Sequence, residues 1–233
     1  MVLSGPAHTA TLADDCLVRN DWVCVEYVRT RSDDIAAALS EHVRIMVLSV
    51  LFGFIVALLM AVVIHRFSRL RGVVLGASTV VYTLPSLVLF SLLLPATGLT
   101  VTTVVTGLVL YALTILVRGI LAGLDGVPAD VREAAVGMGY GSLRLLRKVE
   151  FPLAMPAIFA ALRVATVSTV ALTTVGMVVG HGGLGNLIDR GLQSNFRSEV
   201  LTASVLCVLL AVAADLLLIG IQRWATPWRR VAR

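Results

Sequence analysis

The chain has 233 residues, of which 58% are hydrophobic and 14% charged, and its mean hydropathy is +0.94. Soluble domains are about one-quarter charged, so this composition excludes an ordinary soluble domain and indicates an integral membrane protein. The net charge of +5 does not indicate nucleic-acid binding, because the arginines occur mainly in short runs beside apolar segments, where membrane topology explains them. The single lysine, Lys148, follows no glycine-rich phosphate-binding loop. ATP hydrolysis would therefore have to come from another chain, and we expect this one to be no enzyme.

Residues 1–42 are polar and of mixed charge, and they lack the basic start and apolar centre of a cleaved signal peptide. Cys16 and Cys24 flank the short stretch CLVRNDWVC; outside the cytoplasm a disulfide between them is plausible, and two free thiols fit the sequence equally well. Ser32, followed by DDIAAALSEH, predicts a capped amphipathic helix at the membrane surface. We therefore expect an extracytoplasmic tail that ends in a surface helix.

Five apolar segments follow, each long enough for the roughly 20 residues that cross a hydrocarbon core. They predict an all-α protein with five transmembrane helices in a membrane domain over residues 43–222, followed by a basic tail over 223–233. Twelve arginines and lysines lie near the span ends on one side and six on the other, which places the N-terminus outside and the C-terminus in the cytoplasm. The predicted spans are 43–64, 72–95, 101–122, 153–179 and 200–221.

Polar side chains recur inside these spans. The polar side chains of the fourth span, Arg163 among them, are three or four residues apart and so share one face of a helix. Asp215 in the fifth span lies at nearly the same depth in the membrane as Arg163. For any single threonine, helix packing is the better interpretation. Arg163 and Asp215 either pair or face a common hydrated cavity, since both are costly to bury in lipid; a structural ion pair and a pathway role are equally supported. The candidate pathway residues are Tyr82, Tyr111, Arg163, Thr166, Thr169, Thr173 and Asp215.

A glycine-rich loop, GHGGLG, separates the fourth and fifth spans. Its glycines predict a tight re-entrant turn that lets the backbone approach the pore or a docked partner. His181 has no cysteine, histidine or carboxylate at ligand spacing, so we expect a loop histidine and no metal site. The glycines of this candidate docking or gating loop are Gly180, Gly182, Gly183 and Gly185.

The stretch from 130 to 156 is too polar to span a bilayer. Its pattern predicts two short helices, the first running from near Pro128 to Gly137 and the second from Ser142 to a point before Pro152. By the charge count this segment lies in the cytoplasm.

The run Glu133-Ala134-Ala135, then Gly137, then a hydrophobic and basic stretch reaching Phe151-Pro152, resembles the EAA loop of bacterial ABC importer permeases. LYALTILVRGILAGLDGVP, GHGGLGNLI and YTLPSLVLFSLLLPATGL resemble the osmoprotectant branch, which carries glycine betaine, carnitine and choline. The resemblance covers about residues 40–222. Two positions depart from the family pattern: His181 stands in place of alanine, and Phe151 in place of leucine.

The resemblance implies a multi-pass protein of the bacterial inner membrane whose 125–152 loop couples to a separate ATPase, which binds ATP and Mg²⁺. Small Ala134 and Ala135 would let the first short helix approach a groove, Glu133 would accept hydrogen bonds, and Gly137 would permit the turn. A second permease, either this chain or a paralogue, and an extracytoplasmic solute-binding protein would complete the assembly in the bilayer. The same type of permease for another small zwitterion or amino acid stays open, and an ATP-independent secondary transporter is the weaker alternative.

Overall fold

The computed structural model describes residues 16–230. Residues 1–15 of the expected tail and residues 231–233 at the basic end lie outside the described residues. Within 16–230 the chain forms helices joined by turns, with no strand. The helices are α2 (Cys16–Arg19), α3 (Val25–Thr30), α4 (Ser32–Arg66), α5 (Arg71–Thr83), α6 (Ser86–Thr97), α7 (Val101–Asp125), α8 (Ala129–Gly137), α9 (Ser142–Leu145), α10 (Phe151–Thr173), α11 (Leu184–Gln193) and α12 (Arg197–Ala225).

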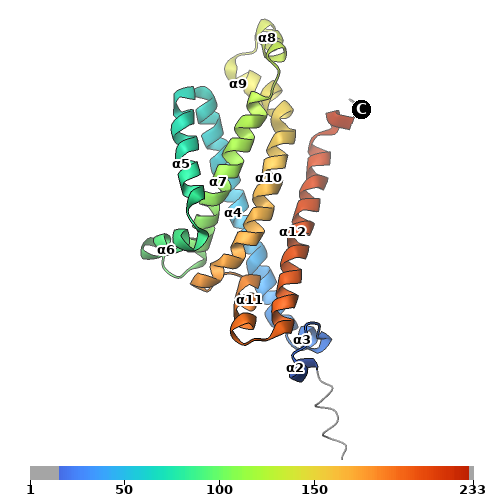
Figure 1. Cartoon of the computed structure of the whole chain (residues 1–233). Helices are drawn as coiled ribbons and strands as arrows, with labels where there is room; N and C mark the ends of the chain where they lie inside the picture. The colour runs from blue at the N-terminus through green and yellow to red at the C-terminus, as the bar shows by residue number, and fades with distance from the viewer. Residues whose placement is uncertain (1–15, 231–233) are drawn as a thin grey trace, which may run out of the picture.

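Long helices run the length of the molecule, with α8 and α9 at one end and α2, α3 and α11 at the other (Figure 1). Four helices are long and apolar enough to cross a membrane, and a fifth span is present if the bent pair α5 and α6 is counted as one. The expectation of five apolar segments in an all-α membrane protein is confirmed, with one of them broken.

The centre of the bundle is formed by α4, α7 and α10, which approach closely because their contact positions are small. A Cβ on Gly119 of α7 would lie 2.1 Å from the Cβ of Ala161 on α10, and one on Gly53 of α4 would lie 3.2 Å from that of Ala112. Small residues at such crossings let helix backbones pack at short range in a membrane. Buried leucine, isoleucine and alanine side chains fill the remaining space around them.

The break between α5 and α6 lies at Leu84 and Pro85, where the helix direction bends by 102°. Pro85 has no N–H to continue the helical hydrogen bonds, and its ring forces Leu84 into an extended conformation, with φ −67° and ψ 133°. The prediction of one continuous span over 72–95 is therefore wrong, because the chain bends sharply between α5 and α6.

Two further expectations on helix limits are corrected. The predicted surface helix is the first part of α4, a single helix of 35 residues, and Ser32 is its first residue without capping it. In the polar stretch, α9 begins at Ser142 as predicted and ends at Leu145, but the helical backbone continues through Pro152 instead of stopping before it. A π-helical turn, Leu146–Glu150, joins α9 to α10, whose second residue is Pro152.

Candidate functional site

Helix α8 projects from the end of the bundle (Figure 1). It spans the predicted first short helix, ending at Gly137 as expected. Glu133 and Ala134 are exposed, whereas Ala135 is 1% exposed and packs inside its own chain. The left-handed residue of the following turn is Gly139, with φ +81°, so the turning role expected of Gly137 falls two residues later.

The base of α8 is held by a buried carboxylate that the sequence did not single out as a site residue. Glu150, in the π-helical turn, is buried; its Oε2 lies 3.1 Å from Nε2 of His65 and its Oε1 lies 2.8 Å from Nε of Arg132. Arg132 on α8 also donates to the backbone carbonyl of Leu124 at the end of α7. Nothing in the sequence brings His65, 85 residues before Glu150, to the same point.

Arg163 and Asp215 form an ion pair. The guanidinium Nε and Nη2 of Arg163 lie 2.7 and 2.8 Å from the two carboxylate oxygens of Asp215, joining α10 to α12. Of the two arrangements that the sequence left open, the structure has the direct pair.

The threonines that share a face with Arg163 do not line an open path in this subunit. Thr166, Thr169 and Thr173 are buried, and each hydroxyl donates to the backbone carbonyl four residues earlier in α10. Thr166 borders a groove of about 440 Å³ between α4, α10 and α12, whose other lining residues are all apolar. This face therefore serves helix packing within the chain, which the sequence interpretation had preferred for each single threonine.

Tyr82 and Tyr111 contact each other edge to face, with ring centroids 5.8 Å apart. Tyr111 is buried and its hydroxyl donates to the carbonyl of Leu84, at the break between α5 and α6, while Tyr82 is half-exposed. The structure thus brings the two candidate pathway tyrosines together beside the broken span.

The glycine loop packs against the chain itself. A Cβ on Gly185 would lie 2.2 Å from the carbonyl oxygen of Thr174, and one on Gly182 would lie 2.5 Å from the amide nitrogen of Met177. Gly180 and Gly183 have positive φ, +79° and +56°, and a Cβ on Gly183 would meet His42 of α4. The close backbone approach expected of these glycines is present, but it is to α4 and to the 3-10 turn Thr174–Val179.

His181 in this loop has a carboxylate partner that sequence spacing could not reveal. Its Nδ1 lies 3.0 Å from Oε1 of Glu41 on α4, 140 positions away along the chain. The adjacent His42 is buried, and its Nε2 lies 3.1 Å from the carbonyl of Val170. These two contacts join the N-terminal part of α4 to the glycine loop and to α10.

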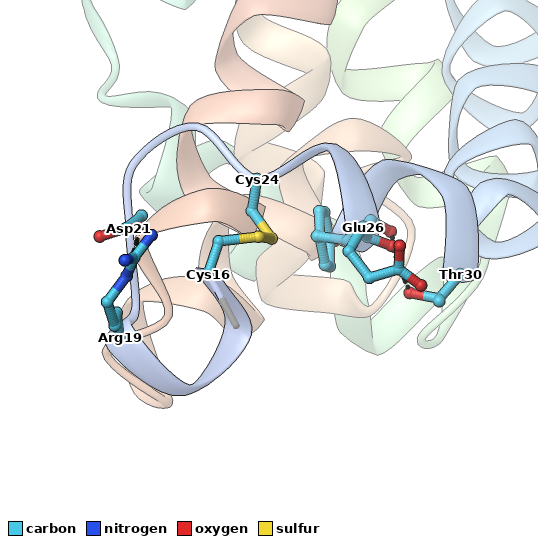
Figure 2. Close-up of a disulfide and its surroundings, with 7 residues drawn as sticks. Cys16, Arg19, Asp21, Cys24, Glu26 and Thr30 are labelled. Carbon is cyan, nitrogen blue, oxygen red and sulfur yellow. Dashed lines mark hydrogen bonds and ion pairs between the residues drawn. A yellow bond between two sulfur atoms is a disulfide. The ribbon is translucent and has the colours of Figure 1, made fainter. Parts of the chain in front are cut away.

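At the same end, Cys16 and Cys24 are joined by a disulfide, the first of the two alternatives left open by the sequence (Figure 2). The side-chain amide of Asn20, inside this loop, donates to the carbonyl of Asn195 at 2.6 Å and accepts from the amide of Arg197 at 2.9 Å. The disulfide-closed loop is thereby fixed to the turn between α11 and α12.

Tyr27 on α3 completes this contact by packing edge to face on Phe196, with ring centroids 5.2 Å apart. Burial, and then the neighbouring carboxylate of Glu199, raise the pKa of the Tyr27 phenol to about 12. Glu199 is buried and lies 2.7 Å from Nε of Arg190, whose pKa that hydrogen bond raises.

Comparison with known proteins identifies the family. The sequence model of the binding-protein-dependent transport system inner membrane component matches residues 49–231. The glycine betaine/carnitine/choline transport system permease protein OpuCD of Bacillus subtilis is 34% identical over 82% of this chain and 83% of its own length. The osmoprotectant import permease protein OsmW of Salmonella typhimurium is 33% identical over 87% of this chain and 97% of its own length.

Among solved structures, an inward-facing conformation of the MetNI methionine ABC transporter superposes with a TM-score of 0.78 at 22% identity, covering 84% of this chain and 98% of that one. This likeness shows the permease fold of ABC importers. The helical spans, the exposed α8 and the matched residues together place the chain in the inner membrane, and it belongs to the family of binding-protein-dependent transport system inner membrane components.

Proposed function

We propose that this permease imports a small osmoprotectant such as glycine betaine, choline or carnitine, and that α8 couples it to a separate ATPase. The observation that carries the coupling is the exposure of α8. Of its nine residues only Ala135 is buried, so Glu133, Ala134 and the rest of the outer surface are free for a groove on a partner. A carboxylate at Glu133 suits an arginine or backbone N–H of that partner.

The orientation in this proposal places α8 in the cytoplasm. Basic residues gather at its end of the molecule, as the positive-inside rule requires of cytoplasmic loops. The disulfide between Cys16 and Cys24 lies at the opposite end, and disulfides persist in the oxidising compartment outside the cytoplasm. An extracytoplasmic solute-binding protein would then dock near residues 180–198.

A second permease, either this chain or a paralogue, would complete the path. Helix α12 is the least buried of the long helices, and Leu209, Val212 and Leu216 on it are exposed. Lipid or a second permease would cover this face. The polar lining that a zwitterion needs is not on the buried threonines of α10, so it would come from residues exposed at the subunit boundary.

The choice of solute rests on the relatives, whose names specify osmoprotectants, glycine betaine, carnitine and choline. Aromatic faces attract quaternary ammonium groups, and Tyr82 and Tyr111 lie side by side in this chain. The chain is only 6% aromatic, so the high-affinity cage would lie in the binding protein. Another small zwitterion or an amino acid is the alternative solute.

Co-purification and uptake test the proposal. The chain, expressed with the ATPase and binding protein of its own transport system, should retain the ATPase and take up radiolabelled glycine betaine or choline only with ATP. Glu133→Ala should lower ATPase retention and uptake, whereas Asp130→Asn, which removes an exposed acid from the same helix, should lower neither as much. ATP-independent flux by the purified chain alone would refute the proposal. Binding assays on the solute-binding protein would identify the solute.

A further inference from the structure

The Glu150 cluster, made of His65, Arg132 and Glu150, joins three helices at one carboxylate. Only 4% of the Glu150 side chain is exposed, and its two oxygens contact different helices: Oε2 lies 3.1 Å from His65 at the end of α4, and Oε1 lies 2.8 Å from Arg132 on α8. Glu150 itself is the last residue before α10. A buried carboxylate requires such partners, because an unpaired charge in a protein interior is strongly unfavourable.

Arg132 extends the same cluster to a fourth helix. Its Nη2 donates to the carbonyl of Leu124 near the end of α7, which also accepts from the backbone amide of Val127. The same guanidinium therefore makes a hydrogen bond to Leu124 through Nη2 and an ion-pair contact with Glu150 through Nε. The position of α8 is therefore set from α7 and from Glu150 through a single side chain.

Few other contacts hold α8 in place. Ala135 is its only buried residue, and the preceding Val127 is the only buried residue in the short link from α7. A helix with so little apolar contact owes its orientation to its polar contacts. The turn that carries Glu150 is π-helical, a local geometry that occurs often at functional sites and whose hydrogen-bond pattern differs from that of the helices it joins.

We infer that Glu150 is a positioning residue which fixes the angle of α8 and transmits a displacement of α8 to α4, α7 and α10. This inference rests on the proposed function in one respect, namely that the displacement originates from an ATPase docked on α8. The geometry distinguishes the two acids, because Glu133 is exposed on α8 whereas Glu150 is buried against His65 and Arg132.

Hydrogen exchange on the permease alone, in lipid nanodiscs, tests the positioning directly and needs no ATPase. Glu150→Gln keeps the shape of the side chain and removes its charge, so amide exchange over residues 129–137 should become about tenfold faster, as expected for loss of a local constraint. Asp130→Asn, the matched loss of one exposed negative charge on α8, should change it by less than about twofold. Unchanged exchange over 129–137 in Glu150→Gln would overturn the inference.

Two further variants keep the test valid should Glu150→Gln fail to fold. Arg132→Lys retains the positive charge but offers a single point of contact, and His65→Gln removes one partner while Glu150 and Arg132 remain paired. Both should speed exchange over 129–137, Arg132→Lys more than His65→Gln. Equal exchange in all variants and in the parent chain would contradict the positioning role.

In the assembled transporter, the amount of solute transported per ATP hydrolysed distinguishes a positioning role from simple destabilisation of the fold. In Glu150→Gln the ATPase should remain bound and active while solute moved per ATP hydrolysed falls about tenfold, within the range seen for residues that couple two sites. A parallel fall in ATPase binding, ATP hydrolysis and thermal stability would instead indicate a purely structural residue. If the proposed function is wrong, the parent chain will retain no ATPase. The hydrogen-exchange measurement needs no ATPase, so it still tests the positioning role of Glu150 in that case.

Discussion

Arg163 on α10 donates two hydrogen bonds, 2.7 and 2.8 Å long, to the two carboxylate oxygens of Asp215 on α12. A bidentate pair of this kind fixes both the distance and the relative rotation of the side chains. It lies in the middle part of helices that cross the membrane, where either charge alone would be costly. The pair therefore joins α10 to α12 in a part of α12 whose apolar residues are largely exposed.

Removing either charge should therefore leave the other unpaired. We expect Asp215→Asn and Arg163→Gln each to lower the yield of monodisperse protein and its melting temperature in detergent. The exchanged double variant, Arg163→Asp with Asp215→Arg, should recover most of the loss. A double variant no better than either single one, judged by size-exclusion chromatography and thermal unfolding, would contradict a direct stabilising pair.

Gly185 is predicted to tolerate no side chain. A Cβ there would lie 2.2 Å from a backbone carbonyl, that of Thr174, so the loop or the 3-10 turn must shift. Gly185→Ala should lower the free energy of unfolding by about 1 to 3 kcal/mol, the usual cost of overpacking. Gly76→Ala is the matched control, because a Cβ at Gly76 would meet nothing within 4 Å. Thermal unfolding of both variants checks the difference, and equal melting temperatures would show that the loop is not tightly packed.

Tyr111 should matter more for stability than Tyr82. Tyr111→Phe removes the hydroxyl that donates to Leu84 at the break in the second span, which should cost about 0.5 to 1.5 kcal/mol. Tyr82 is 47% exposed, and Tyr82→Phe should cost less. Substituting alanine at either position should lower transport modestly without changing solute affinity of the separate binding protein. Loss of that affinity would contradict the expected division of roles.

Reduction should open the disulfide-closed loop locally. A crosslink across eight positions contributes about 2 to 3 kcal/mol by restricting the open chain, so Cys24→Ser should speed amide exchange over residues 16–30 while leaving α7 and α10 unchanged. Mass spectrometry of non-reduced peptides should find Cys16 linked to Cys24. Cys207→Ser is the control, and alkylation of Cys16 and Cys24 without reductant would refute the disulfide.

The same segment should lose stability at high pH. Burial raises the pKa of Tyr27 in the folded chain from 10.0 to about 12, so the folded state keeps its proton where the unfolded state loses it. The stabilising contribution is fully present below pH 10 and is lost as the pH rises through 12. The near-ultraviolet absorbance difference between the parent chain and Tyr27→Phe should titrate near pH 12, and a midpoint near pH 10 would show that Tyr27 is not buried.

Local sequence patterns predicted the features that depend on neighbouring residues, such as helix limits. The start of α7 at Val101 and the extent of α8 follow from hydropathy and from Pro128, and the matched depths of Arg163 and Asp215 allowed their pairing to be considered. Pro85 indicates the break in the second span, but the prediction relied on apolar composition alone and therefore treated residues 72–95 as one continuous helix. The contacts of Glu150 with His65 and of His181 with Glu41 could not be predicted, because they depend on which helix ends the fold brings together.

Helix α4 carries one residue of each of these two contacts, His65 and Glu41. His65, in the Glu150 cluster, and Glu41, beside the glycine loop, are 24 positions apart in an uninterrupted helix, a separation of about 36 Å along its axis. That distance exceeds the roughly 30 Å thickness of the hydrocarbon core. Any tilt, rotation or axial shift of α4 imposed at His65 therefore reaches Glu41 on the opposite side of the bilayer without an intervening joint.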